Sequence, residues 1–197
     1  MAVSLFLTYF GKAADGPALQ GWFRDGPAAA LRSSGAEWLE LYVPEASHDP
    51  FLDDGEGPLL IAEFGFADQT ALENAAASDE FRHWLCDLSG LPVSDCRVTA
   101  EAFEVLPSPV AGESQASPRT APVSYVVRYY RPAGDEEKFI AYYLEHHPAL
   151  LGQFARIRNV LCYRPLTWQN HTGLAESDCM FGNEVVFDSL DDLNAAL

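Results

Sequence analysis

The sequence predicts an α+β fold made of two similar units in tandem. Residues 1–106 contain strand and helix patterns in the order βαββαβ, and residues 123–197 start the same order again. Between them, residues 107–122 are rich in Pro, Ser, Ala and Gly and have no hydrophobic period, a composition typical of a linker. We therefore expect a first domain at 1–106, a linker at 107–122 and a second domain at 123–197.

The first half has the pattern of a ferredoxin-like unit, in which two helices cover one face of an antiparallel sheet. Residues 3–10 are apolar on both alternating faces, as in strands covered on both sides. Ser78, followed by Asp79 and Glu80, is a suitable N-cap with an acidic first turn. The expected elements are strands at 3–10, 37–43, 59–66 and 97–106, a helix at 18–31, a loop at 45–58, and one helix or a broken pair at 70–77 and 78–88.

The second half repeats this layout. The expected elements are strands at 123–131, around 160–163 and at 180–187, helices at 135–154 and from residue 190, and a long loop at 166–178. An ungapped offset of 121 residues gives identities at Tyr9 and Tyr130, Pro27 and Pro148, Tyr42 and Tyr163, Pro44 and Pro165, Glu63 and Glu184, Phe66 and Phe187, and Leu72 and Leu193. Each pair falls at the matching place in the matching element, so we interpret the chain as a duplicated unit.

The duplication has a consequence for the architecture. A four-stranded sheet with helices on one face leaves its other face bare, and here that face is too apolar for water. Two such sheets packed face to face form an intrachain dimeric α+β barrel, with a pocket expected between them. The sequence stops at Leu197 inside the second helix, so the second unit lacks its last strand. A homodimer of this pseudo-dimeric chain is compatible with the pattern.

Composition excludes several classes of function. The 197 residues carry 29 acidic and 12 basic side chains, and a net charge of −17 repels nucleic acids and anionic membranes. Neither a secretory signal nor a long apolar run is recognisable, so we expect a cytoplasmic protein. The four widely spaced cysteines, which predict neither a zinc site nor a disulfide framework, are Cys86, Cys96, Cys162 and Cys179.

The second half resembles the EthD family of dimeric α+β barrels. The stretches that carry the resemblance are VVRYYRP (126–132), EEKFIAYYLEHHPALL (136–151), RIRNVLCY (156–163) and EVVFDSLDDLNAAL (184–197). The residues at the places of the family pattern are Phe139, Tyr142, Tyr143, His147, Pro148, Glu184, Phe187 and Ser189. The usual spacing of the proline in the family would select His146 instead of His147. The first half has Asp25 and Gly26 there, so a histidine site exists only once per chain.

The resemblance implies a loose range of functions. The family looks like a set of small barrels from catabolic and polyketide-type pathways, and its wider superfamily includes lactone isomerases, cyclases, cofactor-free monooxygenases and haem enzymes. Fold alone does not choose among these activities.

His146 and His147 are the candidate acid–base residues. A neutral imidazole beside a substrate carbonyl can take up and return a proton, which isomerisation, cyclisation and dehydration need. Neighbouring helical residues point about 100° apart, so we expect one of the two to face the pocket. The alternative is that one caps the helix and the other is solvated.

Other candidates lie on strands and in the long loop. Glu184 and Glu63 are ionisable residues in apolar strands, where a carboxylate needs a partner. Arg128 is a natural partner for Glu184, as a structural ion pair or as part of a pocket acid. Trp168 lies in the loop at 166–178, which would be either a lid over the barrel mouth or a solvated, mobile loop. Candidate hydroxyls for a substrate carbonyl, which core packing explains equally well, belong to Tyr130, Tyr142, Tyr143 and Tyr163.

These residues favour a cofactor-independent enzyme that acts on a small, largely apolar carbonyl or lactone-like compound. Its catalytic residues would be His147 or His146 with Glu184, and Arg128, a tyrosine and Trp168 would contact the substrate. Neighbouring histidines do not converge on a metal, so no metal site is expected. The alternatives are a non-catalytic barrel that binds a small ligand or serves in assembly, and a haem barrel with His147 as axial ligand.

Overall fold

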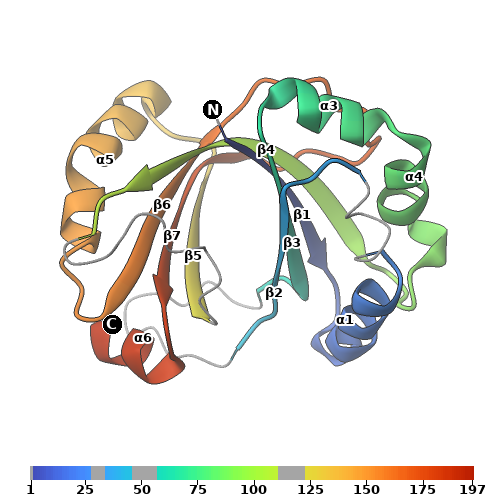
Figure 1. The fold of residues 1–197 in the computed structure, drawn as a ribbon, viewed down its shortest axis with the longest axis horizontal. Helices are drawn as coiled ribbons and strands as arrows, with labels where there is room; N and C mark the ends of the chain where they lie inside the picture. The colour runs from blue at the N-terminus through green and yellow to red at the C-terminus, as the bar shows by residue number, and fades with distance from the viewer. Residues whose placement is uncertain (1, 28–33, 46–56, 111–122) are drawn as a thin grey trace. The chain divides into compact units, whose positions relative to one another are not determined.

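The computed structural model describes residues 2–27, 34–45, 57–110 and 123–197. Within these residues the chain forms two compact units (Figure 1). The segment Leu166–Ser177 groups with the first unit, and the second unit begins at Val105. Residues 111–122 of the predicted linker, residues 28–31 at the end of the predicted helix at 18–31, and residues 46–56 of the predicted loop at 45–58 lie outside the described residues.

The first unit is a four-stranded antiparallel sheet in the order β2-β3-β1-β4. Its strands are β1 (Val3–Phe10), β2 (Trp38–Tyr42), β3 (Leu60–Phe66) and β4 (Arg97–Ser108). Its α-helices are α1 (Gly16–Asp25), α3 (Gln69–Ala77) and the short α4 (Asp79–Phe81), followed by a π-helical turn at Arg82–Cys86. The helices α1 and α3 lie on the same face of this sheet (Figure 1).

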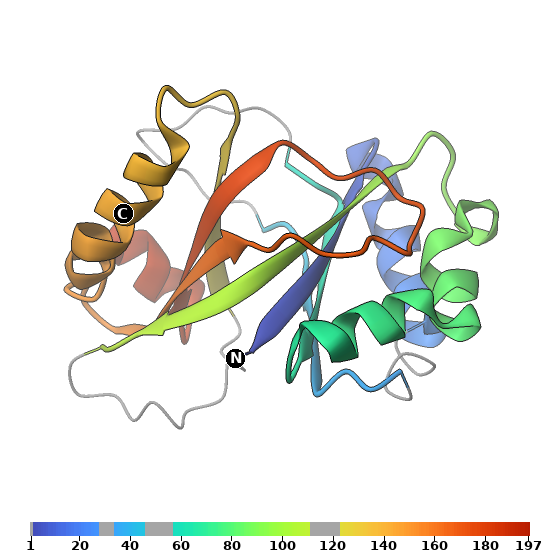
Figure 2. The same cartoon turned by 90° about the horizontal axis from the view of Figure 1, so that it is seen from above.

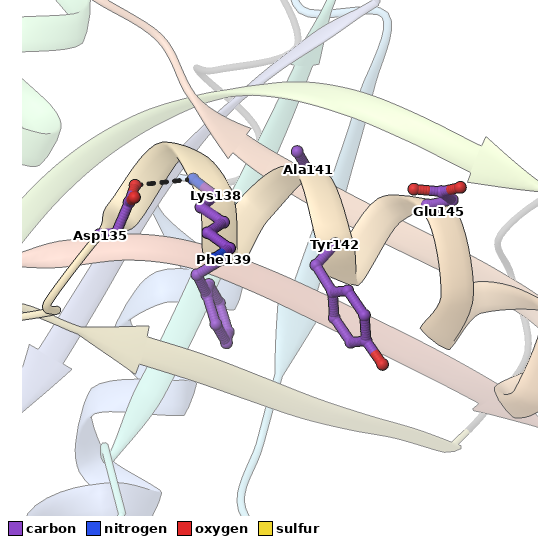
Figure 3. Close-up of a pocket in the computed structure, with 6 residues that line it drawn as sticks. All are labelled: Asp135, Lys138, Phe139, Ala141, Tyr142 and Glu145. Carbon is purple, nitrogen blue, oxygen red and sulfur yellow. Dashed lines mark hydrogen bonds between the residues drawn. The ribbon is translucent and has the colours of Figure 1, made fainter.

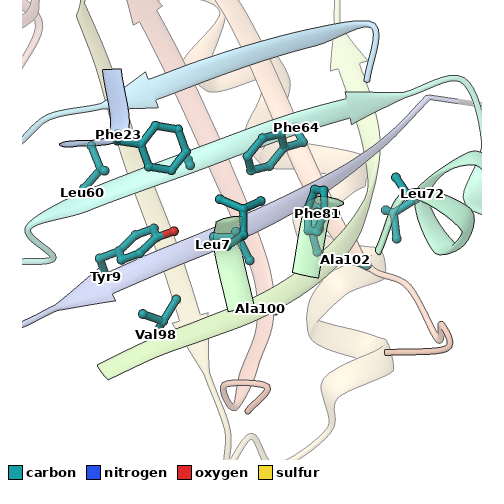
Figure 4. Close-up of a cluster of buried hydrophobic side chains, with 14 of the residues drawn as sticks. Leu7, Tyr9, Phe23, Leu60, Phe64, Leu72, Phe81, Val98, Ala100 and Ala102 are labelled. Carbon is teal, nitrogen blue, oxygen red and sulfur yellow. The ribbon is translucent and has the colours of Figure 1, made fainter. Parts of the chain in front are cut away.

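The core of the first unit lies between that face and the helices. Alternate residues of β1 face the helices because successive side chains of a strand point to opposite sides. Leu7 of β1 is fully buried among Phe64 of β3, Leu72 of α3 and Phe81 of α4 (Figure 4). The predicted helix pair is broken at Ser78, whose Oγ accepts a hydrogen bond from Phe81 N at 3.2 Å. The predicted cap at Ser78 is confirmed.

The second unit has three strands in the order β6-β7-β5, all antiparallel, among the described residues. Its elements are β5 (Val123–Tyr130), α5 (Glu136–Leu151), β6 (Ile157–Pro165), β7 (Cys179–Phe187) and α6 (Leu190–Ala196). Asp135 caps α5 by accepting a hydrogen bond from Lys138 N at 3.0 Å. In both views α5 and α6 lie on one side of these strands (Figures 1 and 2). None of the described helices has the length and apolar content that crossing a bilayer requires.

The strand registers of the two units correspond residue by residue. The pairs are Ser4 with Gly65 and Tyr42 with Ile61 in the first unit, and Ser124 with Val186 and Tyr163 with Gly182 in the second. Because Tyr9 faces Leu60 and Tyr129 faces Phe181, Tyr9 corresponds to Tyr129. The predicted pairing of Tyr9 with Tyr130 is therefore wrong by one residue. A one-residue slip moves a side chain to the other face of the sheet, and the gapless sequence comparison could not detect it.

Replacement of a leucine by alanine should lower the stability much more at a buried position than at an exposed one. We expect Leu7→Ala to lower the free energy of unfolding by about 2–5 kcal/mol, because it leaves a cavity beside Phe64 and Phe81. The matched variant Leu150→Ala, at a side chain 58% exposed on α5, should change it by less than about 0.5 kcal/mol. Urea unfolding followed by circular dichroism measures both, and equal losses would contradict the assigned core.

Candidate functional site

A buried carboxylate with two hydroxyl partners is the most distinctive polar feature of the second unit. Glu184 lies in the middle of β7 and is 1% exposed. Its Oε1 accepts a hydrogen bond from Ser124 Oγ at 2.5 Å, and its Oε2 accepts one from Tyr163 OH at 2.5 Å. A carboxylate taken out of water is stable only with such donors. Sequence reasoning had offered Arg128 as the partner and missed Ser124.

The strand register brings Ser124, Tyr163 and Glu184 together. Ser124 on β5 pairs with Val186, and Tyr163 on β6 pairs with Gly182. Val186 and Gly182 are the residues two positions after and before Glu184, so both hydroxyls are diagonal neighbours of its carboxylate on one face of the sheet. Arg128 on β5 also pairs with Gly182, so it lies on this face and opposite Tyr163.

The first unit contains the same arrangement. Glu63 on β3 is fully buried, and its Oε1 accepts a hydrogen bond from Ser4 Oγ at 2.7 Å. Its Oε2 accepts one from Tyr42 OH at 2.5 Å. Tyr42 and Glu63 are the residues that the offset of 121 aligns with Tyr163 and Glu184. The repeated Tyr and Glu identities were therefore the sequence signal for this cluster.

The two predicted catalytic histidines lie on the other face of the second sheet. Tyr143 of α5 donates a hydrogen bond from its OH to Asn183 Oδ1 at 2.8 Å, so Asn183 faces the helix. Glu184, the next residue of the strand, therefore faces away from it. The ring of His147 stacks on that of Tyr143 with centroids 4.3 Å apart. The structure thus does not bring His147 and Glu184 together.

His146 and His147 have different surroundings on α5. His146 is exposed, and its ring stacks on that of Tyr142 with centroids 4.3 Å apart. Its Nδ1 lies 2.9 Å from the backbone oxygen of Tyr142 and can donate a hydrogen bond to it when protonated. His147 is half-buried, and its Nδ1 is buried without a hydrogen-bond partner among the described residues. Burial also raises the pKa of the Tyr143 hydroxyl, which therefore serves as a hydrogen-bond donor at neutral pH.

Two further predicted contact residues have surroundings of their own. Tyr130 is at the end of β5, 49% exposed, beyond a register irregularity at Tyr129. Trp168 packs against the core of the first unit. Its loop is bound to α3, since Gln69 Nε2 donates to Thr167 O at 2.9 Å and Gln169 N donates to Glu73 Oε1 at 2.9 Å.

The cysteines offer no reactive thiolate in the second unit. All four are thiols outside any disulfide, and Cys162 and Cys179 are buried. Burial raises the pKa of the Cys162 thiol to about 12, so it stays protonated and unreactive at neutral pH. Among the described residues no group of three or more His, Cys, Asp or Glu is placed to hold a metal ion.

An open pocket of about 510 Å³ lies on the outer side of α5 (Figure 3). Its lining residues are Asp135, Lys138, Phe139, Ala141, Tyr142 and Glu145. It contains none of the residues predicted to be catalytic.

Comparison with known proteins gives the fold class. No family model matches the sequence, and no curated protein matches it. An anthrone oxidase-like protein has a TM-score of 0.59 at 16% identity, over 98% of this chain and 76% of that chain. A proposed monooxygenase from Lactobacillus acidophilus NCFM has a TM-score of 0.53 at 9% identity, over 98% and 80%. The fold is that of the dimeric α+β barrels.

An EthD family protein from Bacillus halodurans C-125 is also similar, with a TM-score of 0.41 at 20% identity, over 53% of this chain and 98% of that chain. The α+β barrel fold with ferredoxin-like units expected from the sequence is confirmed by the two structures with the higher TM-scores. At these identities the likeness extends to the fold and not to the reaction.

The contribution of the hydrogen bonds to Glu184 can be tested by measuring the free energy of unfolding of tyrosine variants. We expect Tyr163→Phe to lower the free energy of unfolding by about 1–3 kcal/mol, because Glu184 Oε2 loses a donor in a buried place. Tyr142→Phe removes a hydroxyl from a residue 58% exposed and should cost less than about 0.5 kcal/mol. If urea unfolding shows no difference between the two variants, the hydrogen bond to Glu184 does not stabilise the unit.

Proposed function

We propose that the chain is a cofactor-independent acid–base enzyme of the α+β barrel class, with Glu184 as its proton-transfer group. Its substrate would be a small, largely apolar carbonyl or lactone-like compound. The observation that carries the proposal is the buried carboxylate held by Ser124 and Tyr163 on the sheet face that also bears Arg128. The enclosed pocket between the two sheets stays a prediction.

The hydrogen bonds around Glu184 are those of a general base. Each hydroxyl has one proton and donates it to a different oxygen of the Glu184 carboxyl group, so both contacts use the carboxyl as an acceptor. An ionised carboxylate can remove a proton from the carbon beside a carbonyl group. When it returns that proton to a different carbon, the double bond has moved and no electron has left the substrate.

Tyr163 and Arg128 would stabilise the charge that develops in this step. As Glu184 takes the proton, negative charge moves to the substrate oxygen, and Tyr163 can turn its hydroxyl from the neutralised carboxyl to that oxygen. Arg128 lies on the strand on the other side of Gly182. Gly182 has no side chain between the two, and a Cβ there would lie 3.6 Å from Tyr163 Cβ. A carbonyl oxygen above Gly182 would meet both donors.

This proposal gives to Glu184 the role that the sequence had assigned to the histidines. His147 and His146 belong to α5, on the opposite face of the sheet from Glu184. The haem alternative would place its axial ligand, His147, on the α5 side of the sheet and not beside Glu184.

A non-catalytic barrel that binds a small ligand is the competing function. It is favoured by the fact that both oxygens of Glu184 already have partners, since the same contacts would also hold a purely structural carboxylate in place.

Substitution of Glu184 by glutamine tests the catalytic role. Glu184→Gln keeps the size of the side chain but cannot take up a proton, so we expect turnover of a lactone and enol panel, followed by NMR, to fall about 10²–10⁴-fold. Glu63→Gln is the matched control in the first unit and should keep the wild-type rate.

The outcomes distinguish the two functions. Equal rates for wild type and Glu184→Gln would remove Glu184 from the mechanism. Saturable binding of a panel compound without turnover by the wild type would favour the ligand-binding barrel. Unfolding midpoints of both variants show whether a lost rate reflects lost folding.

We also infer that residues 1–106 and 123–197 are copies of one duplicated unit, joined by a linker at 107–122. The support is the shared register of β1, β2 and β3 with β5, β6 and β7, together with the repeated Ser, Tyr and Glu cluster.

A further inference from the structure

Helix α5 carries exposed aromatic and charged side chains on the side away from its sheet. Tyr143 marks the side that faces β7, since it is 3% exposed and hydrogen-bonded to Asn183. Successive residues of a helix are rotated by about 100°, so Tyr142 points outward and is 58% exposed (Figure 3). The outer face of α5, as we define it, consists of Lys138, Phe139, Tyr142, Glu145 and His146.

The ring of Tyr142 is held in place although it is exposed. It stacks on the imidazole of His146, with centroids 4.3 Å apart and an angle of 17° between the ring planes. The hollow of about 510 Å³ lies beside it and is lined by Phe139 as well. A ring that is already fixed loses little conformational freedom when a partner packs on it, and tyrosine is enriched at protein–protein interfaces. The outer face is therefore suited to receive an aromatic side chain of another protein chain.

The charges on the outer face are complementary to themselves. When two antiparallel copies of a helix are related by a two-fold axis at Tyr142, residues before Tyr142 on one copy lie opposite residues after it on the other. Lys138 is four positions before Tyr142, and Glu145 is three positions after it. At a rise of about 1.5 Å per residue, the two charged residues of opposite copies then differ by only about 1.5 Å along the helix axis. Each ammonium group would meet a carboxylate.

The same alignment brings aromatic rings together. At about 100° per residue, Lys138 and Glu145 lie on one side of Tyr142 around the helix, and Phe139 and His146 lie on the other side. A two-fold axis perpendicular to the two helices keeps like sides together, so Phe139 of one copy lies opposite His146 of the other. Every contact then occurs twice, as in the self-complementary interfaces of symmetric dimers.

We propose that the outer face of α5 is a homodimer interface, in which α5 of a second copy of the chain packs against it in antiparallel orientation. Charge complementarity favours a second copy as the partner, because the face carries a cation and an anion at places that satisfy each other. The contact runs along a single helix of 16 residues, so it is small, and the dimer forms at about 10 µM to 1 mM protein. The inference does not depend on catalysis by Glu184, which faces away from α5.

Truncation of the central tyrosine tests the interface. Sedimentation of the full chain over this concentration range should show a monomer–dimer equilibrium. Tyr142→Ala should raise the dissociation constant at least about tenfold, because it removes the ring at the centre of the contact. The matched variant Leu150→Ala, at a side chain of α5 that is also 58% exposed but lies outside the outer face, should leave the constant unchanged.

Charge reversal tests the predicted alignment. Lys138→Glu would place two carboxylates opposite each other and Glu145→Lys two ammonium groups, so each should weaken the dimer about 3–10-fold. The double variant exchanges the charges, keeps the net charge of the wild type and should restore dimerisation. Glu145→Lys is the decisive single variant. It makes the acidic chain less negative, so relief of general repulsion would strengthen association, whereas the proposed pairing requires that association weakens.

Two outcomes overturn the proposal. A wild type that stays monomeric over the whole range would leave the outer face to a partner of another kind. A dimer that persists in Tyr142→Ala and in both charge reversals would form through a different surface. Circular dichroism checks the helix content of each variant, and if Tyr142→Ala loses helix, recovery of the dimer in the double charge variant still decides the question.

Discussion

A glutamate in the middle of a buried strand is the constraint on which the polar structure of each unit depends. Glu63 lies at the centre of β3 and Glu184 next to the centre of β7, and every residue of both strands is buried. A carboxylate in such a place costs several kcal/mol unless donors surround it. In both units the donors are a serine from one neighbouring strand and a tyrosine from the other, so the carboxylate links three strands.

This requirement also selects the strand register. Each hydroxyl residue reaches its glutamate because its partner on the glutamate's strand is two positions from that glutamate. These residues are Ser4, Ser124, Tyr42 and Tyr163. A slip of one residue would turn the hydroxyl to the helix side and leave the carboxylate oxygen without that donor. The polar cluster therefore adds specificity to a sheet whose apolar faces would tolerate several alignments, and it places ionisable groups where water is scarce.

The two units share this cluster but differ beside it. Glu40 of β2 pairs with Glu63 in the first unit, and Leu161 of β6 pairs with Glu184 in the second. On the other face of the second sheet, Tyr143 and Asn183 join α5 to β7, and His147 belongs to that packing interface.

The sequence by itself determined the element order, the break and cap at Ser78, the α+β barrel class and the correspondence of Tyr42 and Glu63 with Tyr163 and Glu184. These features follow from local periodicity, capping residues and spacing along the chain. The tertiary structure decided that serines complete the clusters, that Tyr9 corresponds to Tyr129, and that the histidines face away from Glu184. Those outcomes depend on strand register and on which side of a sheet a helix packs. Both involve contacts between residues far apart in the chain, such as the 59 positions between Ser4 and Glu63 and the 60 between Ser124 and Glu184. The pattern of a single segment does not contain such contacts.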